Sequence, residues 1–215
     1  MRIRTVSGIE GARTATGDVV IIDVLRAFTA AAYAFAAGIE EIELVSTVDE
    51  AMARPGFRMG EVDGHLIPGF DHDNSPSGLV GRRLSGRAVQ RTGAGTQCAV
   101  AATGASQLWL ASLVVVSATA RALRDRPDIT LVISGAPLEG EEDRGCALCL
   151  EALLRGDALP RRQAVELVLG SRAAQLHRTD DPHRPIADLE CATAIDRFDF
   201  AMRVQRGIAR PVLFS

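Results

Sequence analysis

The chain has 215 residues, of which 47% are hydrophobic and 24% charged, and its formal net charge is −3. This composition is too apolar for a disordered chain and suffices for one domain with a buried core, or for two closely packed lobes with the second from about residue 160. All 24 basic residues are arginine, which excludes mechanisms that need a lysine amine, including Schiff-base chemistry and the P-loop lysine. Phosphate or carboxylate ligands would therefore be bound by arginines, backbone N–H groups or a metal ion.

The charge pattern and the cysteines restrict the partners and the compartment. The arginines are dispersed and the net charge is small, so nothing indicates nucleic-acid binding. Four scattered cysteines and an N-terminus without an apolar export signal indicate a cytoplasmic protein. The uncharged stretch between Arg91 and Arg121 could span a bilayer by length, but its Thr, Ser and Gln residues favour a buried helix, a strand and the start of another helix. We therefore expect no membrane association.

Short apolar runs alternate with helical patterns along the chain. The run at 18–25 is almost entirely apolar, as in a strand buried on both faces of a parallel sheet, and Thr47 begins a capping box. Further strands are predicted at 41–46, 57–61, 86–92, 110–117, 128–136 and about 211–214. Helices are predicted at 27–38, 47–54, behind the 93–96 turn, and at 118–125, 146–155, 164–176 and 186–195. This alternation predicts an α/β fold with a mostly parallel sheet flanked by helices.

Polar residues follow several of the predicted strands. Asp23 and Arg26 leave the first strand, Glu61 leaves the third, Arg91 leaves the fourth, and the acidic stretch 139–143 follows the last central strand. Ligands of open parallel sheets bind outside the carboxyl ends of the strands, so these groups are expected to meet there. Mg²⁺ prefers a few carboxylates with waters and substrate phosphate, and the spacing therefore favours a magnesium site.

Other interpretations of these acids stay open. The residues Glu139 and Glu141 are adequately explained as favourable charges at a helix N-terminus. Asp23 is different, because a carboxylate at the end of a buried apolar strand must be compensated by a partner. We therefore expect Asp23 to be functional.

Five segments in a fixed order resemble the 2-phosphosulfolactate phosphatase family. They are VVIIDVLRAFTAA, the Gly-Glu pair at 60–61, PGFDHDNSPSG at 68–78, RTGAGT at 91–96 and GEEDRGCALCLEALL at 140–154. The likeness covers roughly residues 18 to 200. It implies a Mg²⁺-dependent hydrolase that converts 2-phosphosulfolactate to 3-sulfolactate and phosphate in a branch leading to coenzyme M. It also implies the family's own α/β fold and a homo-oligomer.

The resemblance extends to individual residues. The positions it matches, and would make catalytic, are Asp23, Arg26, Asp71, Asn74 and Ser75. Glu61 matches the acid of the family's Gly-Glu-Arg segment, and Glu142 and Asp143 match its Glu-Asp pair before a helix. Three positions depart from the family: Val62, Asp73 and Ala94 stand where it has arginine, glycine and asparagine. Losing a cation and gaining an acid would weaken the binding of a substrate that carries phosphate, sulfonate and carboxylate.

The residues themselves favour metal-assisted hydrolysis of a small anionic phosphoester. Mg²⁺ would be held by Asp23, Glu61 and Asp143, with Glu142 beside them. The substrate's oxygens would be bound by Arg26, by Arg91 and by the turn at Gly93–Gly95 at a helix N-terminus, with Thr92, Gly95 and Thr96 contributing. The nucleophile is a metal-bound water or Asp23 itself, and the absence of lysine favours water. Two alternatives stay open: a phosphatase acting on another small acidic phosphoester, and a catalytically silent homologue that binds an anion.

Several other motifs are better explained by packing or solvation. Cys146 and Cys149 have helical spacing in an apolar segment, and Cys191 lacks the glycine-rich loop of a cysteine phosphatase. The segment with His177 and His183 is interpreted as a solvated loop. His65 and His72 are weaker candidates for acid–base groups.

Overall fold

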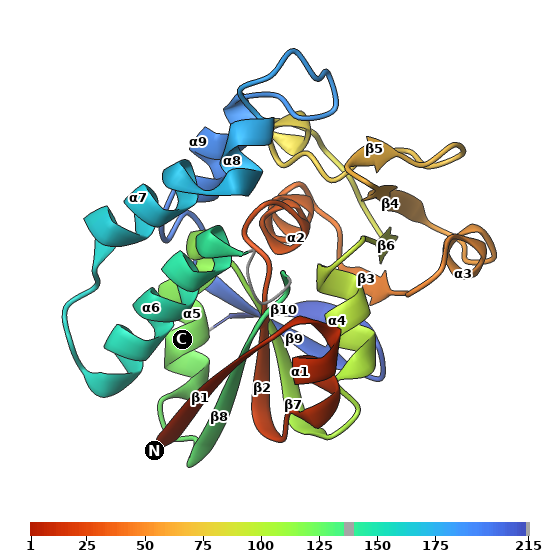
Figure 1. Cartoon of the computed structure of the whole chain (residues 1–215). Helices are drawn as coiled ribbons and strands as arrows, with labels where there is room; N and C mark the ends of the chain where they lie inside the picture. The colour runs from red at the N-terminus through yellow and green to blue at the C-terminus, as the bar shows by residue number, and fades with distance from the viewer. Residues whose placement is uncertain (136–139, 214–215) are drawn as a thin grey trace.

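The computed structural model of the chain describes residues 1–135 and 140–213 (Figure 1). Within these residues ten strands form one sheet, in the order β1-β8-β2-β7-β9-β10-β3-β6-β4-β5. The strands are β1 (Arg2–Ser7), β2 (Gly17–Ile22), β3 (Glu41–Leu44), β4 (Phe57–Val62), β5 (His65–Leu66), β6 (Arg87–Arg91), β7 (Ala105–Ala111), β8 (Asp128–Ile133), β9 (Phe200–Gln205) and β10 (Ile208–Leu213).

Helices flank this sheet on both faces (Figure 1). The α-helices are α1 (Gly8–Thr14), α2 (Ala27–Ala36), α3 (Val48–Met52), α4 (Gly95–Ala101), α5 (Val116–Leu123), α6 (Glu141–Arg155), α7 (Arg161–Gly170), α8 (Arg172–Leu176) and α9 (Ala187–Thr193). Two short 3-10 turns, η1 (Ser77–Leu79) and η2 (Leu113–Val115), complete the elements of the described residues.

The sheet consists of two parallel blocks joined by an antiparallel hairpin. β1, β8, β2 and β7 run parallel in one block, and β3, β6 and β4 run parallel in the other. β9 and β10 pair with each other and with the flanking strands β7 and β3 in antiparallel fashion, and β5 pairs antiparallel with β4. The predicted α/β class with a mostly parallel sheet is therefore confirmed, with an antiparallel insertion that the sequence pattern did not indicate.

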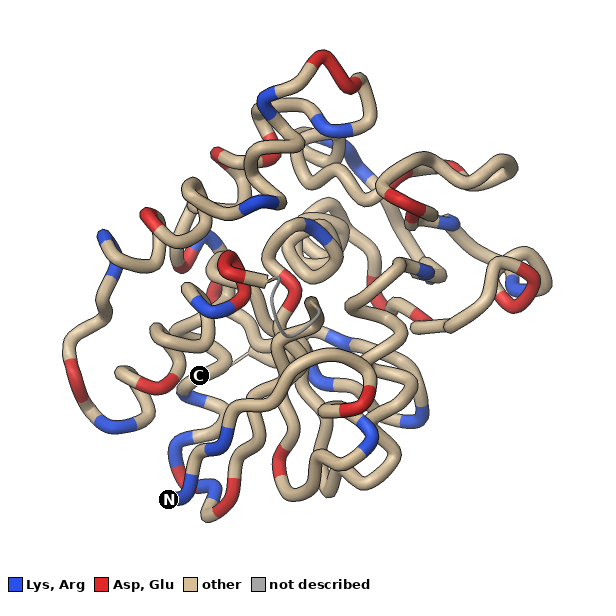
Figure 2. The backbone as a smooth tube through the Cα atoms, in the orientation of Figure 1, with Lys and Arg blue, Asp and Glu red and all other residues tan. Residues whose placement is uncertain are grey.

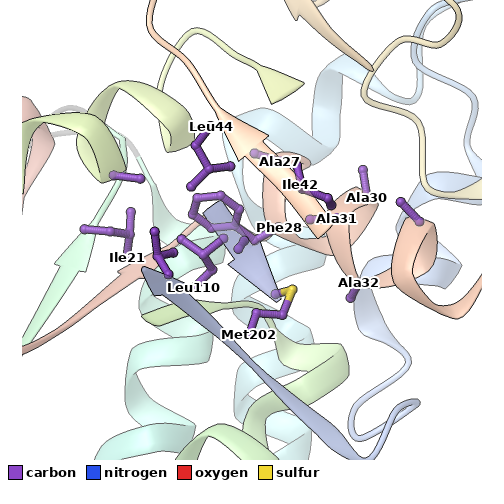
Figure 3. Close-up of a cluster of buried hydrophobic side chains, with 14 of the residues drawn as sticks. Ile21, Ala27, Phe28, Ala30, Ala31, Ala32, Ile42, Leu44, Leu110 and Met202 are labelled. Atoms are coloured by element: carbon purple, nitrogen blue, oxygen red, sulfur yellow. The ribbon is translucent and has the colours of Figure 1, made fainter. Parts of the chain in front are cut away.

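The helix α2 is buried on every side. All its residues from Ala27 to Phe35 are buried, and Phe28 packs among Ile21, Leu110 and Met202 from three strands (Figure 3). A helix that is apolar all round belongs in the core, and alanine side chains let strands and helices approach closely. This packing places the N-terminus of α2, and with it Asp23 and Arg26, at the centre of the fold.

The strand β2 is buried on both faces, as its apolar run predicted. Val19 and Ile21 face the core cluster that contains α2 and α4, whereas Val20 and Ile22 face the cluster built from α5 and α6. Successive side chains of a strand point to opposite faces, so a strand covered twice needs apolar residues at every position. The turn after β2 therefore begins from a rigid, buried element.

One predicted strand is wrong in its extent. Instead of spanning 110–117, β7 ends at Ala111, and the following residues form η2 and then α5 from Val116. Leu113 to Val116 are fully buried, and a short apolar run in a buried helix cannot be distinguished by periodicity from a buried strand. The strands β1, β5 and β9 and the helix α1 were not predicted. No residue of β1 or β5 is fully buried, and β9 interrupts its buried positions with half-buried ones, so none of these strands shows a continuous apolar run.

Local signals were more reliable at helix ends. Thr47 accepts a hydrogen bond from the Glu50 amide, and the Glu50 carboxylate accepts one from the Thr47 amide, which confirms the capping box. The longest helix, α6, begins at Glu141 and not at the predicted residue 146, and its first turn contains Glu141, Glu142 and Asp143. Glu139 lies outside the described residues. None of the helices in the described ranges is long and apolar enough to cross a membrane.

Candidate active site

A cavity of about 190 Å³ lies beyond the carboxyl ends of β2, β4 and β6. Five of the sequence-predicted site residues line it: Asp23, Arg26, Glu61, Asn74 and Thr92. Seven further residues complete its wall: Leu25, Gly64, Ala94, Ala173, Leu176, His177 and Arg184. The cavity is smaller than the roughly 300–1,000 Å³ of drug-sized pockets and suits a small metabolite. A larger groove of about 760 Å³ at the amino end of β7 contains none of the predicted residues.

Asp23 stands at the end of β2 and is 6% exposed. Its Oδ1 accepts a hydrogen bond from the Ala27 amide at 2.8 Å, and its Oδ2 lies 3.1 Å from the Ser134 hydroxyl. Burial raises the pKa of Asp23 to about 6, with a further increase from the charge of Glu61, while the hydrogen bonds from Ala27, Ser134 and Gly95 lower it. A carboxyl that titrates near neutral pH is suited to proton transfer.

Asp143 lies behind Asp23, in the first turn of α6. Its Oδ1 accepts from the Val24 amide at 2.8 Å, and its Oδ2 accepts from the amide and the hydroxyl of Ser134, each at 3.1 Å. Burial first, and then the charges of Asp23 and Glu142, raise the pKa of Asp143 well above its usual value. Asp143 therefore ties the ends of β2 and β8 together.

Glu61 reaches the cavity from β4. Its Oε2 accepts from the Gly64 amide and its Oε1 from the Gly93 amide, both at 2.6 Å. These two amides belong to the β4–β5 turn and to the turn before α4, so the carboxylate links both turns. Arg91 also contacts this strand, because its Nη1 donates to the Glu61 carbonyl at 2.7 Å and its Nε to the Ser46 carbonyl. Arg91 thus supports the backbone and does not line the cavity.

The turn before α4 approaches Asp23 closely. A side chain at Gly95 would place its Cβ 2.6 Å from Oδ2 of Asp23 and 2.9 Å from Cβ of Ala27, so glycine is required there. Thr92 and Thr96 hold the turn, since the Thr92 amide donates to Thr96 Oγ1 at 2.8 Å and the Thr96 amide to Thr92 Oγ1 at 3.1 Å. Of these three predicted residues, only Thr92 lines the cavity.

Arg26 is held by a buried ion pair with Asp188 of α9. Its Nη1 lies 3.0 Å from Asp188 Oδ2, and the two side chains are 5% and 0% exposed. The same nitrogen donates to the His183 carbonyl at 2.6 Å, and Nη2 donates to the Gly64 carbonyl at 3.3 Å. The guanidinium thereby joins three segments that are distant in sequence.

The predicted loop residues separate into two groups. Asn74 is buried at the cavity, where its Oδ1 accepts from Gln90 Nε2 at 3.1 Å. Ser75 is also buried, but its hydroxyl donates to Asp188 at 2.6 Å, away from the cavity wall. Asp71 is exposed, and its carboxylate accepts from the Arg58 amide, so the structure does not bring it to the other site residues.

The predicted magnesium ligands do not form a ready-made cluster. Across residues 1–135 and 140–213, no group of three or more His, Cys, Asp or Glu side chains is placed to hold a metal ion. Asp23 and Glu61 line the cavity, whereas the oxygens of Asp143 are directed to Val24 and Ser134 and the buried Glu142 does not line it. Two carboxylates still fit Mg²⁺, which commonly takes one or two from the protein and completes its octahedron with water and phosphate oxygens.

Sequence reasoning missed four residues around the cavity. Ser134 follows the clear strand β8, so the rule that located Asp23 could have found it. Asp188 lies in a C-terminal segment that also resembles the family, but no role was predicted for it. The segment interpreted as a solvated loop instead contributes His177 and Arg184 to the wall. Burial lowers the pKa of His177, whose Nδ1 lies 3.1 Å from the Pro185 carbonyl.

The remaining motifs are structural. The thiols of Cys146 and Cys149 are buried in α6, and all four cysteines are free. Neither His65 nor His72 lines the cavity: His65 is on the exposed β5, and His72 contacts the Ser75 carbonyl at 2.8 Å. Figure 2 shows acidic and basic residues interspersed along the chain, in agreement with the dispersed arginines of the sequence.

Comparison with known proteins gives a consistent result. Residues 3–205 match the model of the family described as 2-phosphosulpholactate phosphatase. A Bacillus subtilis protein is 32% identical over 200 residues, which are 87% of this chain and 86% of that protein. A Synechocystis protein is 35% identical over 63% of this chain and 61% of its own length, and a Symbiobacterium thermophilum protein is 32% identical over 79% and 75%. Each of the three bears the name probable 2-phosphosulfolactate phosphatase.

Proposed function

We infer the reaction from the family: the chain belongs to the 2-phosphosulpholactate phosphatase family, whose members are phosphoric monoester hydrolases. We propose that it hydrolyses 2-phosphosulfolactate to 3-sulfolactate and phosphate. The relatives named above carry this substrate in their names. The 2-phosphosulfolactate molecule is small and carries phosphate, carboxylate and sulfonate groups, and a cavity of about 190 Å³ with two arginines in its wall suits such a ligand.

One observation supports this function most strongly. The buried carboxyl of Asp23, with a pKa of about 6, shares a single small cavity with Glu61, Arg26 and Arg184. Perturbed carboxyls in a cavity are candidates for acid–base chemistry, and guanidinium groups bind phosphoryl and other anionic oxygens. Proton transfer and anion binding, both required for phosphomonoester hydrolysis, thus lie in one place.

We also propose that the reaction depends on Mg²⁺, held by Asp23 and Glu61 from the cavity wall. The mutual repulsion that helps to raise the pKa of Asp23 would be relieved by a cation between these carboxylates. Bound there, Mg²⁺ supplies positive charge to offset the phosphoryl oxygens. Direct coordination by Glu142 and Asp143 stays a prediction, and the contacts of Asp143 suit a supporting role better.

In the proposed mechanism Asp23 accepts a proton from the attacking water. The water oxygen forms a bond to phosphorus while the bond from phosphorus to the substrate's C2 oxygen breaks. The C2 oxygen takes up a proton from solvent, and Asp23 releases the proton that it accepted from the attacking water to solvent. The chain contains no lysine that could support an aspartyl-phosphate intermediate, which favours water attack over a phospho-enzyme. Acid quenching during turnover of ³²P-labelled substrate is expected to leave no label on the protein, and labelled Asp23 would reverse this assignment.

The departures from the family support one alternative. Ala94 lines the cavity, Val62 is 39% exposed on the β4 edge, and Asp73 accepts from the Ser75 amide. Ala94 is therefore the substitution that could alter the substrate directly. A phosphatase for another small acidic phosphoester is the second candidate, and a silent anion-binding homologue is the third. A cytoplasmic location, a place in coenzyme M synthesis and a homo-oligomer are proposed on the family resemblance and on the free cysteines.

The test is a comparison of substrates with the purified chain and Mg²⁺. Phosphate release is measured for 2-phosphosulfolactate, phospholactate and 2-phosphoglycerate, each with and without EDTA. We expect the highest kcat/KM with 2-phosphosulfolactate and a loss of activity with EDTA. A preference for another ester would establish the second candidate. Binding of 3-sulfolactate without phosphate release from any ester would establish the third.

A further inference from the structure

The segment between α8 and α9, drawn at the top of Figure 1, borders the cavity. It contributes His177 and Arg184 to the wall. Its backbone is bound to Arg26, which also lines the cavity, because the His183 carbonyl accepts a hydrogen bond from Arg26 at 2.6 Å. On the opposite side, Arg184 Nη2 donates to the Asp63 carbonyl at 2.7 Å, in the β4–β5 turn. The segment therefore closes one side of the cavity and places an arginine there.

Arg184 keeps unused hydrogen-bonding capacity. Of the five N–H donors of a guanidinium, one on Nη1 is directed to Asp181 and one on Nη2 to the Asp63 carbonyl. Within the part of the chain that the structure describes, the other three have no protein acceptor. Its side chain is 18% exposed and lines the cavity, so the guanidinium can be reached by a ligand there.

The guanidinium of Arg184 packs directly against the backbone of Gly64. A Cβ at Gly64 would lie 1.9 Å from Nη2 and 2.4 Å from Cζ of Arg184, and Gly64 has φ +83°. Glycine is thus needed for the turn and for the close approach of the arginine. The Gly64 amide also donates to Glu61, so the same turn positions Arg184 and the carboxylate proposed to hold Mg²⁺.

Arg26 is less available for a second anionic group. Both protons of its Nη1 are directed to Asp188 and to the His183 carbonyl, and Nη2 donates to Gly64. The paired carboxylate of Asp188 is 0% exposed, so little solvent screens the pair and it offsets the charge of Arg26 inside the protein. Arg184 is paired with the more exposed Asp181 and keeps more donors, which makes it the better ligand for a further anion.

We propose that Arg184 binds the non-phosphoryl anionic group of the substrate, its sulfonate or carboxylate, and so selects phosphoesters that carry a second acid. The proposal rests on the proposed phosphatase function. It assigns substrate selection to a segment that the sequence suggested was only a solvated loop. Planar guanidinium groups bind carboxylate and sulfonate oxygens through pairs of N–H donors, which an ammonium or amide does not reproduce.

The first test measures binding without turnover. Titration calorimetry with 3-sulfolactate compares the wild-type chain, Arg184→Gln and Arg184→Lys. The matched control is Arg178→Gln, because Arg178 belongs to the same segment but donates to the Leu169 carbonyl outside the cavity. We expect Arg184→Gln to weaken binding by about 10- to 100-fold, as for the loss of charge-assisted hydrogen bonds, and Arg178→Gln to have no effect. Thermal unfolding of each variant verifies that it is folded.

Three ligand comparisons identify the group that is bound. Lactate retains the carboxylate alone, 2-hydroxypropanesulfonate retains the sulfonate alone, and inorganic phosphate has neither. If Arg184→Gln weakens the binding of lactate, Arg184 binds the carboxylate. If it weakens the binding of 2-hydroxypropanesulfonate, Arg184 binds the sulfonate. An equal effect on inorganic phosphate would overturn the proposal, because Arg184 would then hold the phosphoryl group.

The second test separates this proposal from the proposed function. For the wild type and Arg184→Gln, kcat/KM is measured for 2-phosphosulfolactate and for isopropyl phosphate, which lacks a second acid. The ratio of the two values is expected to fall by about 10- to 100-fold in Arg184→Gln and to stay constant in Arg178→Gln. If the wild type hydrolyses neither ester, the phosphatase proposal fails, and the binding experiment still decides the role of Arg184. Wild-type binding and an unchanged ratio in Arg184→Gln would overturn the inference.

Discussion

Asp23 and Asp143 share one serine hydroxyl: Ser134 Oγ lies 3.1 Å from Oδ2 of each carboxylate. A hydroxyl has a single proton to donate, so it can stabilise only one of the two negative charges at a time. Burial raises the pKa of both carboxyls; the charge of Glu61 adds to the increase at Asp23, and the charges of Asp23 and Glu142 add to the increase at Asp143. The pair is therefore a place where one proton is readily exchanged beside the cavity.

Removing this hydroxyl is expected to shift the pH dependence of activity. The hydrogen bond from Ser134 lowers the pKa of Asp23, so Ser134→Ala raises it further, and a higher pH is needed to form the basic carboxylate. We expect the acidic limb of the kcat/KM profile to move upward by about one pH unit. Ser112→Ala is the control, because the buried Ser112 hydroxyl makes no hydrogen bond within the described residues. Superimposable profiles for Ser134→Ala and the wild type would refute the role of Ser134.

The raised pKa of Asp23 also has a consequence for stability in metal-free protein. The pKa of Asp23 is about 6 in the folded protein and 3.8 in the unfolded chain, so protonation of Asp23 favours folding. This contribution to the free energy of unfolding is fully present below pH 4 and is lost as the pH rises through 6. The difference between the two pKa values corresponds to about 3 kcal/mol in the free energy of unfolding. In EDTA, Asp23→Asn should therefore gain stability relative to the wild type between pH 4 and pH 7. Chemical unfolding at the two pH values measures this gain, and a pH-independent difference contradicts it.

Glu61→Gln tests the proposed metal ligand. The amide oxygen can still accept a hydrogen bond, but the side chain loses its charge, and Mg²⁺ binding should weaken. We expect the Mg²⁺ concentration for half-maximal activity to rise by about tenfold or more, the effect of losing roughly 1.4 kcal/mol of binding. A Mg²⁺ titration of phosphate release measures it. An unchanged midpoint would remove Glu61 from the metal site.

Gly95→Ala tests the close approach of the α4 turn to Asp23. The new methyl group would lie 2.6 Å from a carboxylate oxygen and must displace either the turn or Asp23. We expect a loss of about 1–3 kcal/mol in the free energy of unfolding, typical of overpacking, together with reduced activity. Gly170→Ala is the matched control, because no heavy atom lies within 4 Å of its added Cβ. Equal stability of the two variants would contradict the packing argument.

Asp188→Asn tests the ion pair that positions Arg26. Removing one charge leaves a buried guanidinium without its counterion, which should cost about 3–5 kcal/mol. The bonds from Ser75 and Ser77 to the same carboxylate would weaken as well. Glu166→Gln breaks an exposed pair with Arg162 on α7 and should cost less than about 0.5 kcal/mol. Denaturant titrations measure the free energy of unfolding of Asp188→Asn and Glu166→Gln. Similar small losses in both variants would contradict a stabilising ion pair between Asp188 and Arg26.

The central part of the fold could be predicted from the sequence because local and global signals agree there. The apolar run of β2 requires cover on both faces, and the alanine-rich α2 supplies it on one. The rule for carboxyl ends of parallel strands then locates Asp23 and Glu61 correctly. The extent of β7 was wrong because Leu113 to Val116 are buried in either conformation.

The rest of the site depends on contacts between distant segments, which a sequence pattern does not encode. Arg26 meets Asp188 across 162 residues, and Arg184 meets Asp63 across 121. Asp71 was predicted from the family resemblance of its segment; in the structure it does not line the cavity, and its carboxylate accepts a hydrogen bond from the Arg58 amide. The position of side chains at the ends of strands could be predicted from the sequence, whereas the segments that cover the cavity could not.

The most direct measurement of the central claim is phosphate release from 2-phosphosulfolactate with Mg²⁺ by the wild type, Asp23→Asn and Asp128→Asn. The carboxylate of Asp128 pairs with Arg2 on β1, and Asp128 does not line the cavity, so its variant controls for the loss of an acid elsewhere. We predict wild-type turnover, retained turnover in Asp128→Asn, and loss of turnover in a folded Asp23→Asn. Wild-type rates in Asp23→Asn would contradict the assignment of this cavity as the active site.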